Sequence, residues 1–121
     1  MNKDNFDGIC RQLAAQIQAT VLDLERKLHI HQEPISVVES DAADPKMPNA
    51  PMAQRWTYGQ PPSARTIRVI FDYALPDWTP NIIVASTGVE HPESFLIRMP
   101  DDSAALLSYI CERVTVLNRE T

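Results

Sequence analysis

Two histidines and a glutamate at alternate positions are the first residues whose types could do chemistry. On a β-strand His29, His31 and Glu33 would share one face, and imidazole and carboxylate groups are common zinc ligands. The apolar spacing before them instead predicts the end of a helix, where residues two apart point in different directions. We therefore expect no metal site here, and the histidines should interact with the negative end of the helix.

The other arrangements that could support catalysis are incomplete. Ser86, Thr87 and His91 lie close together, but their segment lacks the Gly-x-Ser-x-Gly turn of a hydrolase nucleophile. The chain has 3 glycines and no glycine-rich phosphate loop. Asp101 and Asp102 are better explained as residues that begin a helix, because acidic side chains favour its positive end. We expect neither an enzyme nor a bound cofactor.

Arginine and aromatic residues, the types that most often dominate binding energy between proteins, gather after a proline-rich stretch. Arg55, Trp56 and Tyr58 lie together there, and Trp78 lies in a separate predicted turn. These four residues form the predicted partner-binding site, in which Arg55 would pair with a carboxylate of the partner. The alternative is structural, with Trp56 and Tyr58 folded back to cap the sheet.

A long amphipathic helix is predicted over residues 5–30, because apolar residues recur with the helical period. Its central stripe, Leu13, Ile17, Val21 and Leu24, is expected to be either core or dimer interface. The helix would be about 39 Å long, whereas a compact chain of this length has a diameter of roughly 35 Å. The excess length predicts a homodimer in which a second copy covers one end.

The remaining pattern predicts a single α+β domain over residues 1–121, with the helices packed on the sheet. The further elements are expected to be a short strand at 35–39, a long proline-rich loop at 41–63, an antiparallel three-stranded meander at 66–75, 81–86 and 93–99, and a C-terminal helix from 100 to about 119. Within the loop, residues 52–58 could be a strand or an ordered loop.

Aliphatic residues occur on both faces of the predicted strands. Ile70, Ile83, Ala85 and Leu96 lie on the face away from the best apolar stripe. A sheet with one wet face should carry polar residues there. Either the two helices cover opposite faces of the sheet, or one face packs against another chain.

Charge and composition exclude further classes of protein. The formal net charge is −5 and the basic residues do not cluster, which argues against nucleic-acid binding. No apolar run approaches the roughly 18 residues of a membrane span, and the N-terminus lacks the pattern of a signal peptide. We therefore expect a cytoplasmic protein, in which Cys10 and Cys111 are free buried thiols.

These observations favour a non-catalytic protein-binding module that acts as a homodimer, such as a small regulator, inhibitor, immunity protein or chaperone. The alternative is a small-ligand-binding or enzymatic α+β domain with a pocket between residues 41–63 and the sheet. In size and charge the chain is similar to type III secretion chaperones, which place a helix between two groups of strands where this chain has its proline-rich loop. No site residue is transferred from that resemblance.

Overall fold

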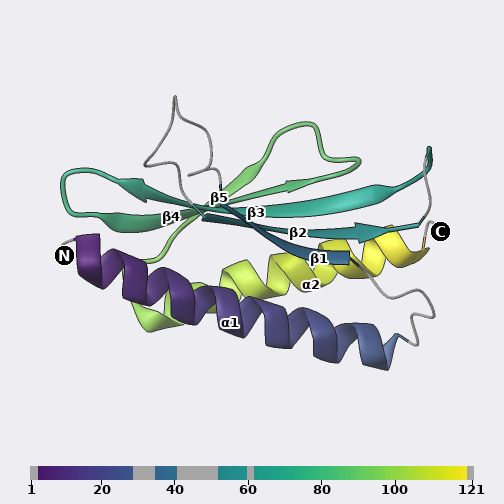
Figure 1. Cartoon of the computed structure of the whole chain (residues 1–121), viewed down its shortest axis with the longest axis horizontal. Helices are drawn as coiled ribbons and strands as arrows, with labels where there is room; N and C mark the ends of the chain where they lie inside the picture. The colour runs from purple at the N-terminus through teal and green to yellow at the C-terminus, as the bar shows by residue number, and fades with distance from the viewer. Residues whose placement is uncertain (1–2, 29–34, 41–51, 60–61, 120–121) are drawn as a thin grey trace.

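The computed structural model describes residues 3–28, 35–40, 52–59 and 62–119, and it confirms the α+β class (Figure 1). Helix α1 spans Lys3–Lys27, and helix α2 spans Ser103–Arg119 after a short 3-10 turn, η2, at Pro100–Asp102. Between the helices lie five strands: β1 (Ile35–Ser40), β2 (Met52–Tyr58), β3 (Arg65–Ala74), β4 (Thr79–Ser86) and β5 (Glu93–Leu96).

The five strands form one antiparallel sheet in the order β1-β2-β3-β4-β5. The meander is therefore longer than the predicted three strands, and residues 52–58, for which the sequence allowed a strand or an ordered loop, form β2. Residues 52–58 show the alternation of a strand, because Gln54, Trp56 and Tyr58 are buried on one face while Arg55 is exposed on the other.

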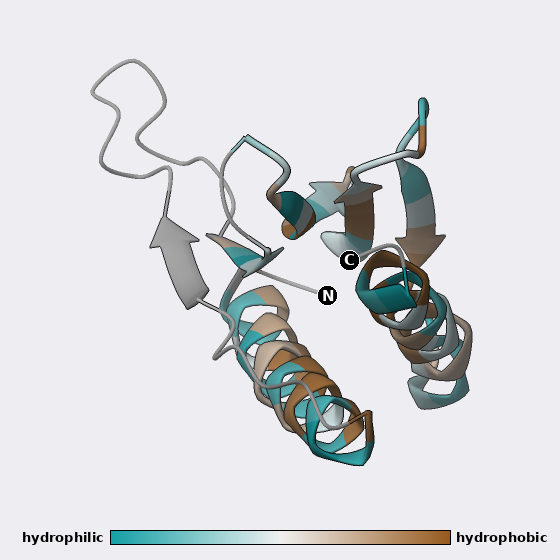
Figure 2. Cartoon of the chain, turned by 90° about the vertical axis from the view of Figure 1, so that its right-hand side faces the viewer, coloured by the Kyte–Doolittle hydropathy of each residue, from teal (hydrophilic) through white to brown (hydrophobic). Residues whose placement is uncertain are grey.

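Both helices pack on the same face of the sheet (Figure 1). The view turned by a quarter (Figure 2) shows them side by side beneath the strands, with their hydrophobic residues turned inward. The first alternative from the sequence, helices on opposite faces, is therefore wrong. The aliphatic residues on the second face have no helix over them in the part of the chain that the structure describes.

The core lies between the two helices and the sheet face that they cover. Leu13, Ile17 and Val21 of α1 are buried in it, and Leu24 is half-buried against it. The stripe expected to be core or dimer interface is thus core. The sheet and α2 supply most of the rest through Trp56, Ile67, Val69, Phe71, Ile82, Val84, Leu106, Ile110, Val114 and Leu117.

The end of β5 shows how one side chain sets a boundary. The backbone N–H groups of Arg98 and Met99 donate to Oδ2 of Asp102, at 2.8 Å and 2.9 Å. These two amides are therefore used by the start of the helical segment, and β5 ends at Leu96 rather than at Met99 as predicted. The interpretation of Asp102 as a helix-start residue is confirmed, and the two amide donors lower the pKa of its carboxyl.

Candidate functional site

The candidate site is the face of the sheet that points away from the helices. We call it the open sheet face and define it as the outward-facing side chains of β2, β3, β4 and β5. Cross-strand pairing sets its central residues in three rows: Arg55 with Arg68, Ile70 with Ile83, and Asp72 with Asn81. Along the strands the face thus carries a basic row, an aliphatic row and a row with a carboxylate.

The exposure of these residues is uneven, and Ala53, which pairs with Ile70 and extends the aliphatic row onto β2, is fully buried. Arg55 is exposed, and Leu96 on β5 is 42% exposed. Ile70 and Ile83 are half-buried by their neighbours in the sheet. Aliphatic side chains with a charged row beside them are typical of surfaces that bind another protein.

The charged residues of the open sheet face already have contacts within the chain. Arg55 and Arg68 each take part in an interaction, and the buried Nε of Arg68 has no hydrogen-bond acceptor among the described residues. Oδ1 of Asp72 accepts a hydrogen bond from the backbone N–H of Tyr73, at 2.8 Å. The hydrogen bond from Tyr73 holds the Asp72 carboxylate against its own strand, while each guanidinium carries five N–H donors in a fixed plane.

The structure separates the four residues of the predicted partner-binding site. Trp56 and Tyr58 are 2% and 3% exposed and face the helices, whereas Arg55 faces the opposite side. Burial of Trp56 and Tyr58 agrees with the structural alternative, in which they support the sheet. Partner binding by Arg55 stays a prediction, with Arg68 as its neighbour in place of the aromatic pair.

Trp78 lies in the turn between β3 and β4, with a positive φ of 58°. Its ring stacks on Tyr73 with centroids 4.4 Å apart, and Phe6 of α1 meets Tyr73 edge to face at 5.7 Å. Aromatic pairs of this kind stabilise by about 0.5–1.5 kcal/mol beyond their buried area. Trp78 therefore helps to hold the first turns of α1 against the β3–β4 hairpin.

The sequence also held the signal for two residues that were not selected. The alternation of β3 places Arg68 and Asp72 on the same face as Ile70, because residues two apart share a face of a strand. In the sequence alone, only the aliphatic residues of that face indicate an unusual surface. Arg68 and Asp72 become candidate binding residues once the pairing with β2 and β4 arranges them in rows.

A buried polar pair lies on the covered side of the sheet. Glu25 of α1 is 6% exposed and its carboxyl lies beside the Tyr58 hydroxyl, but neither Oε2 of Glu25 nor that hydroxyl makes a well-aligned hydrogen bond among the described residues. Burial raises the pKa of the Glu25 carboxyl, and the Tyr58 hydroxyl offsets part of that rise. Burial and the nearby Glu25 charge raise the pKa of Tyr58 as well. The pair is enclosed by the fold and offers no surface to a substrate.

Ser86 and Thr87, considered above for catalysis, have structural partners. Nε of Arg113 on α2 donates to Oγ of Ser86, and its Nη2 donates to the carbonyl oxygen of Thr87, both at 2.9 Å. His91 is exposed in the connection to β5. The serine and threonine thus attach α2 to the end of β4.

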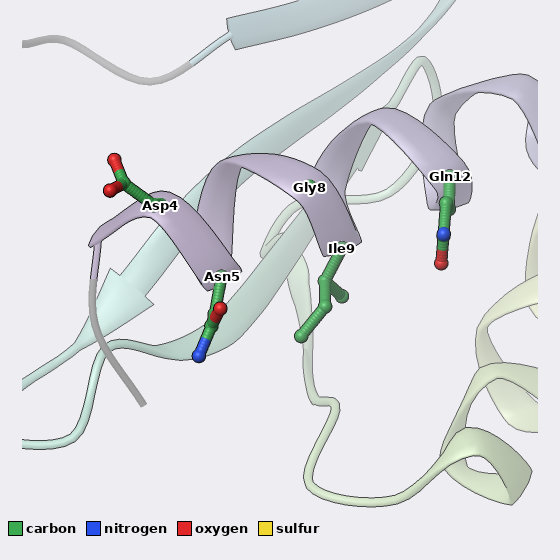
Figure 3. A pocket seen from close by; sticks show the side chains of 5 residues that line it. All are labelled: Asp4, Asn5, Gly8, Ile9 and Gln12. Atoms are coloured by element: carbon green, nitrogen blue, oxygen red, sulfur yellow. The ribbon is translucent and has the colours of Figure 1, made fainter.

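A shallow depression follows the first three turns of α1 (Figure 3). Figure 3 shows the side chains of Asn5, Ile9 and Gln12 extending to one side of α1 and that of Asp4 to the other, and all of them line the depression with Gly8. All of its lining residues belong to α1. The ligand pocket expected between residues 41–63 and the sheet is a different place, and residues 41–51 and 60–61 of that segment lie outside the described residues.

The other expectations about chemistry concern metals, thiols and membranes. No group of three or more metal-ligating side chains occurs within the described ranges, and His29, His31 and Glu33 lie outside them. Cys10 is a buried free thiol and Cys111 a half-buried one. Neither described helix is long and apolar enough to cross a membrane.

No protein-family model, no curated protein and no solved structure matches the chain. The geometry of the open sheet face is therefore the basis for assigning a function.

Proposed function

We propose that the chain is a non-catalytic protein-binding module whose binding surface is the open sheet face. Its place in the cell would be the cytoplasm, and its role that of a small regulator, inhibitor, immunity protein or chaperone. The homodimer expected from the sequence belongs to the same proposal.

One observation carries the proposal. The Ile70–Ile83 row lies on a sheet face that no described helix covers, and charged or polar residues flank it on both sides. Burying half-exposed aliphatic side chains stabilises a complex by roughly 25 cal/mol per Å² of apolar surface. The arginines beside the row can add hydrogen bonds in fixed directions, which favours specific partners.

The test is photo-crosslinking in cells that naturally express the chain. A photoreactive amino acid replaces Thr57 on the open sheet face, and in a control chain it replaces Glu112 on the exposed side of α2. We expect a covalent adduct with a protein at position 57 that is absent at position 112.

A second variant ties the adduct to the aliphatic row. Ile83→Glu should abolish the adduct at position 57, whereas Leu22→Glu, at a leucine of α1 that is 47% exposed, should leave it unchanged. Adducts that form only at position 112, or that survive Ile83→Glu, would show that the binding surface lies elsewhere.

A further inference from the structure

Resting on the proposed function, we infer that the chain docked on the open sheet face is a second copy of this chain. The two copies would be related by a two-fold axis that runs along the Ile70–Ile83 row. Each Arg68 would then lie over Asp72 of the other copy.

The pattern on β3 is self-complementary. Arg68, Ile70 and Asp72 occupy alternate positions on one face, so that Arg68 and Asp72 each lie about 6.6 Å from Ile70 along the strand. A rotation of 180° about an axis that crosses the strands at Ile70 places Arg68 of one copy opposite Asp72 of the other. Two equivalent ion pairs form, and the two Ile70 side chains meet between them, as an isologous interface requires.

The neighbouring strand fits the same operation. Asn81, Ile83 and Ala85 of β4 are the cross-strand partners of Asp72, Ile70 and Arg68. The rotation brings Ile83 against its own copy and places Ala85 opposite Asn81, with no like charges facing each other. An axis parallel to the strands would instead set Arg68 against Arg68, which is unfavourable.

The size of the face sets the expected strength of the dimer. With strands about 4.8 Å apart and about 3.3 Å per residue, the 7, 10, 8 and 4 residues of β2, β3, β4 and β5 cover roughly 460 Å² per copy. The resulting total of about 900 Å² is typical of weak interfaces, below the roughly 1,200 Å² at which standard specific interfaces begin. Two twisted sheets of the same hand pack well at about −30° and about 10 Å. The dimer should therefore form at micromolar or higher concentrations.

Sedimentation velocity of the full chain tests the inference, at concentrations up to about 0.5 mM and at about 0.15 M salt. We expect a species of twice 13.6 kDa for the wild type. Arg68→Asp and Asp72→Arg should each weaken the dimer by about tenfold or more, because like charges then face each other. An equimolar mixture of the two variants should dimerise again, since one copy supplies two carboxylates and the other two guanidinium groups.

Matched controls come from the exposed Asp23–Lys27 ion pair of α1, which joins residues four apart as Arg68 and Asp72 are. Lys27→Asp and Asp23→Arg change the net charge by the same amounts and should leave the dimer intact. A second measurement does not depend on charged variants. In a Cys111→Ser background, a short bis-maleimide should crosslink two copies of Ile70→Cys across the two-fold axis, because Cα atoms about 10 Å apart are too distant for a direct disulfide, whereas copies of Leu22→Cys should not be joined.

Three results would overturn the inference: a wild-type monomer at every concentration, a dimer that both charge reversals leave unchanged, or folded variants whose mixture stays monomeric. These results are distinct from failure of the proposed function. A monomer that still gives a position-57 adduct with a different protein overturns the homodimer but leaves the open sheet face as a protein-binding surface. A chain that gives no adduct and no dimer overturns both.

Discussion

Glu25 carries a carboxyl group that the fold shields almost completely from water. Its side chain is 6% exposed, and burial raises its pKa above the ordinary value of 4.5. A raised pKa in the folded state means that folding favours the protonated form. The stability that this group contributes is therefore complete below its unfolded pKa and is lost as pH rises through the folded pKa.

Glu25→Gln should accordingly stabilise the protein near neutral pH. The amide keeps the shape of the side chain without a buried charge, and we expect a gain on the order of 1 kcal/mol or more. Thermal unfolding measured between about pH 4 and about pH 8 should show the variant's advantage growing with pH. The control is Glu112→Gln, which removes the same charge from an exposed position. An advantage shared by both variants would mean that net charge, rather than burial, is responsible.

The two thiols should differ in reactivity. Burial, with a smaller effect of Asp7, raises the pKa of Cys10 to about 12, so that almost none of it is thiolate at neutral pH. Burial also raises the pKa of Cys111, but this thiol is only half-buried and Lys27 opposes part of the rise. A thiol reagent should modify Cys111 first in the native protein and Cys10 only after unfolding. Equal rates for Cys111→Ser and Cys10→Ser chains would contradict this order.

At the scale of the elements, hydrogen bonds from side chains to the backbone join helices to strands. Nε2 of Gln54 on β2 donates to the carbonyl oxygen of Ala14 in the middle of α1, at 3.0 Å. Arg113 likewise joins α2 to the end of β4 by hydrogen bonds. Each contact fixes how far a helix slides along the sheet, which apolar packing alone leaves loosely defined.

β2 is the element whose loss should be most damaging. Trp56 → Ala removes a side chain that is 2% exposed at the centre of this strand, and we expect a loss of about 3–5 kcal/mol in the free energy of unfolding. Urea denaturation followed by circular dichroism measures the loss. The control is Arg55→Ala on the opposite face of β2, which should change stability far less. Comparable losses in the two variants would show that both faces of β2 are packed.

At the scale of the whole molecule, the two faces of the sheet should respond oppositely to the same substitution. Ile82 is fully buried toward the helices, while its neighbour Ile83 lies on the open sheet face. Ile82→Glu should cost more than about 3 kcal/mol because it buries an unpaired charge. Ile83→Glu should stay within about 1 kcal/mol of the wild type, because its carboxylate reaches water. Thermal unfolding at a concentration below dimerisation compares them, and unfolding of the Ile83 variant would mean that something covers this face.

Elements with a clear apolar period can be predicted from the residues alone. Both helices, the strands β3 and β4 and the core stripe of Leu13, Ile17 and Val21 follow from apolar residues at helical or alternate spacing. The sequence of β2 is compatible with a strand or a loop, because prolines border it and its alternation includes the polar Gln54 on the buried side. That glutamine is tolerated inside because it donates to Ala14, a contact that no local pattern reveals.

The choice of the sheet face that the helices cover is made by packing between distant segments and cannot be read from local periodicity. The periodicity of a helix shows that it has an apolar stripe, but it does not show which face of a sheet receives that stripe. Two helices at opposite ends of the chain reach the same face here (Figure 1). That arrangement buries Trp56 and Tyr58 and leaves Arg55 on the other side, beside Arg68. Proximity along the chain grouped the aromatic residues with Arg55, whereas pairing between strands separated them, because alternate residues of a strand belong to opposite faces.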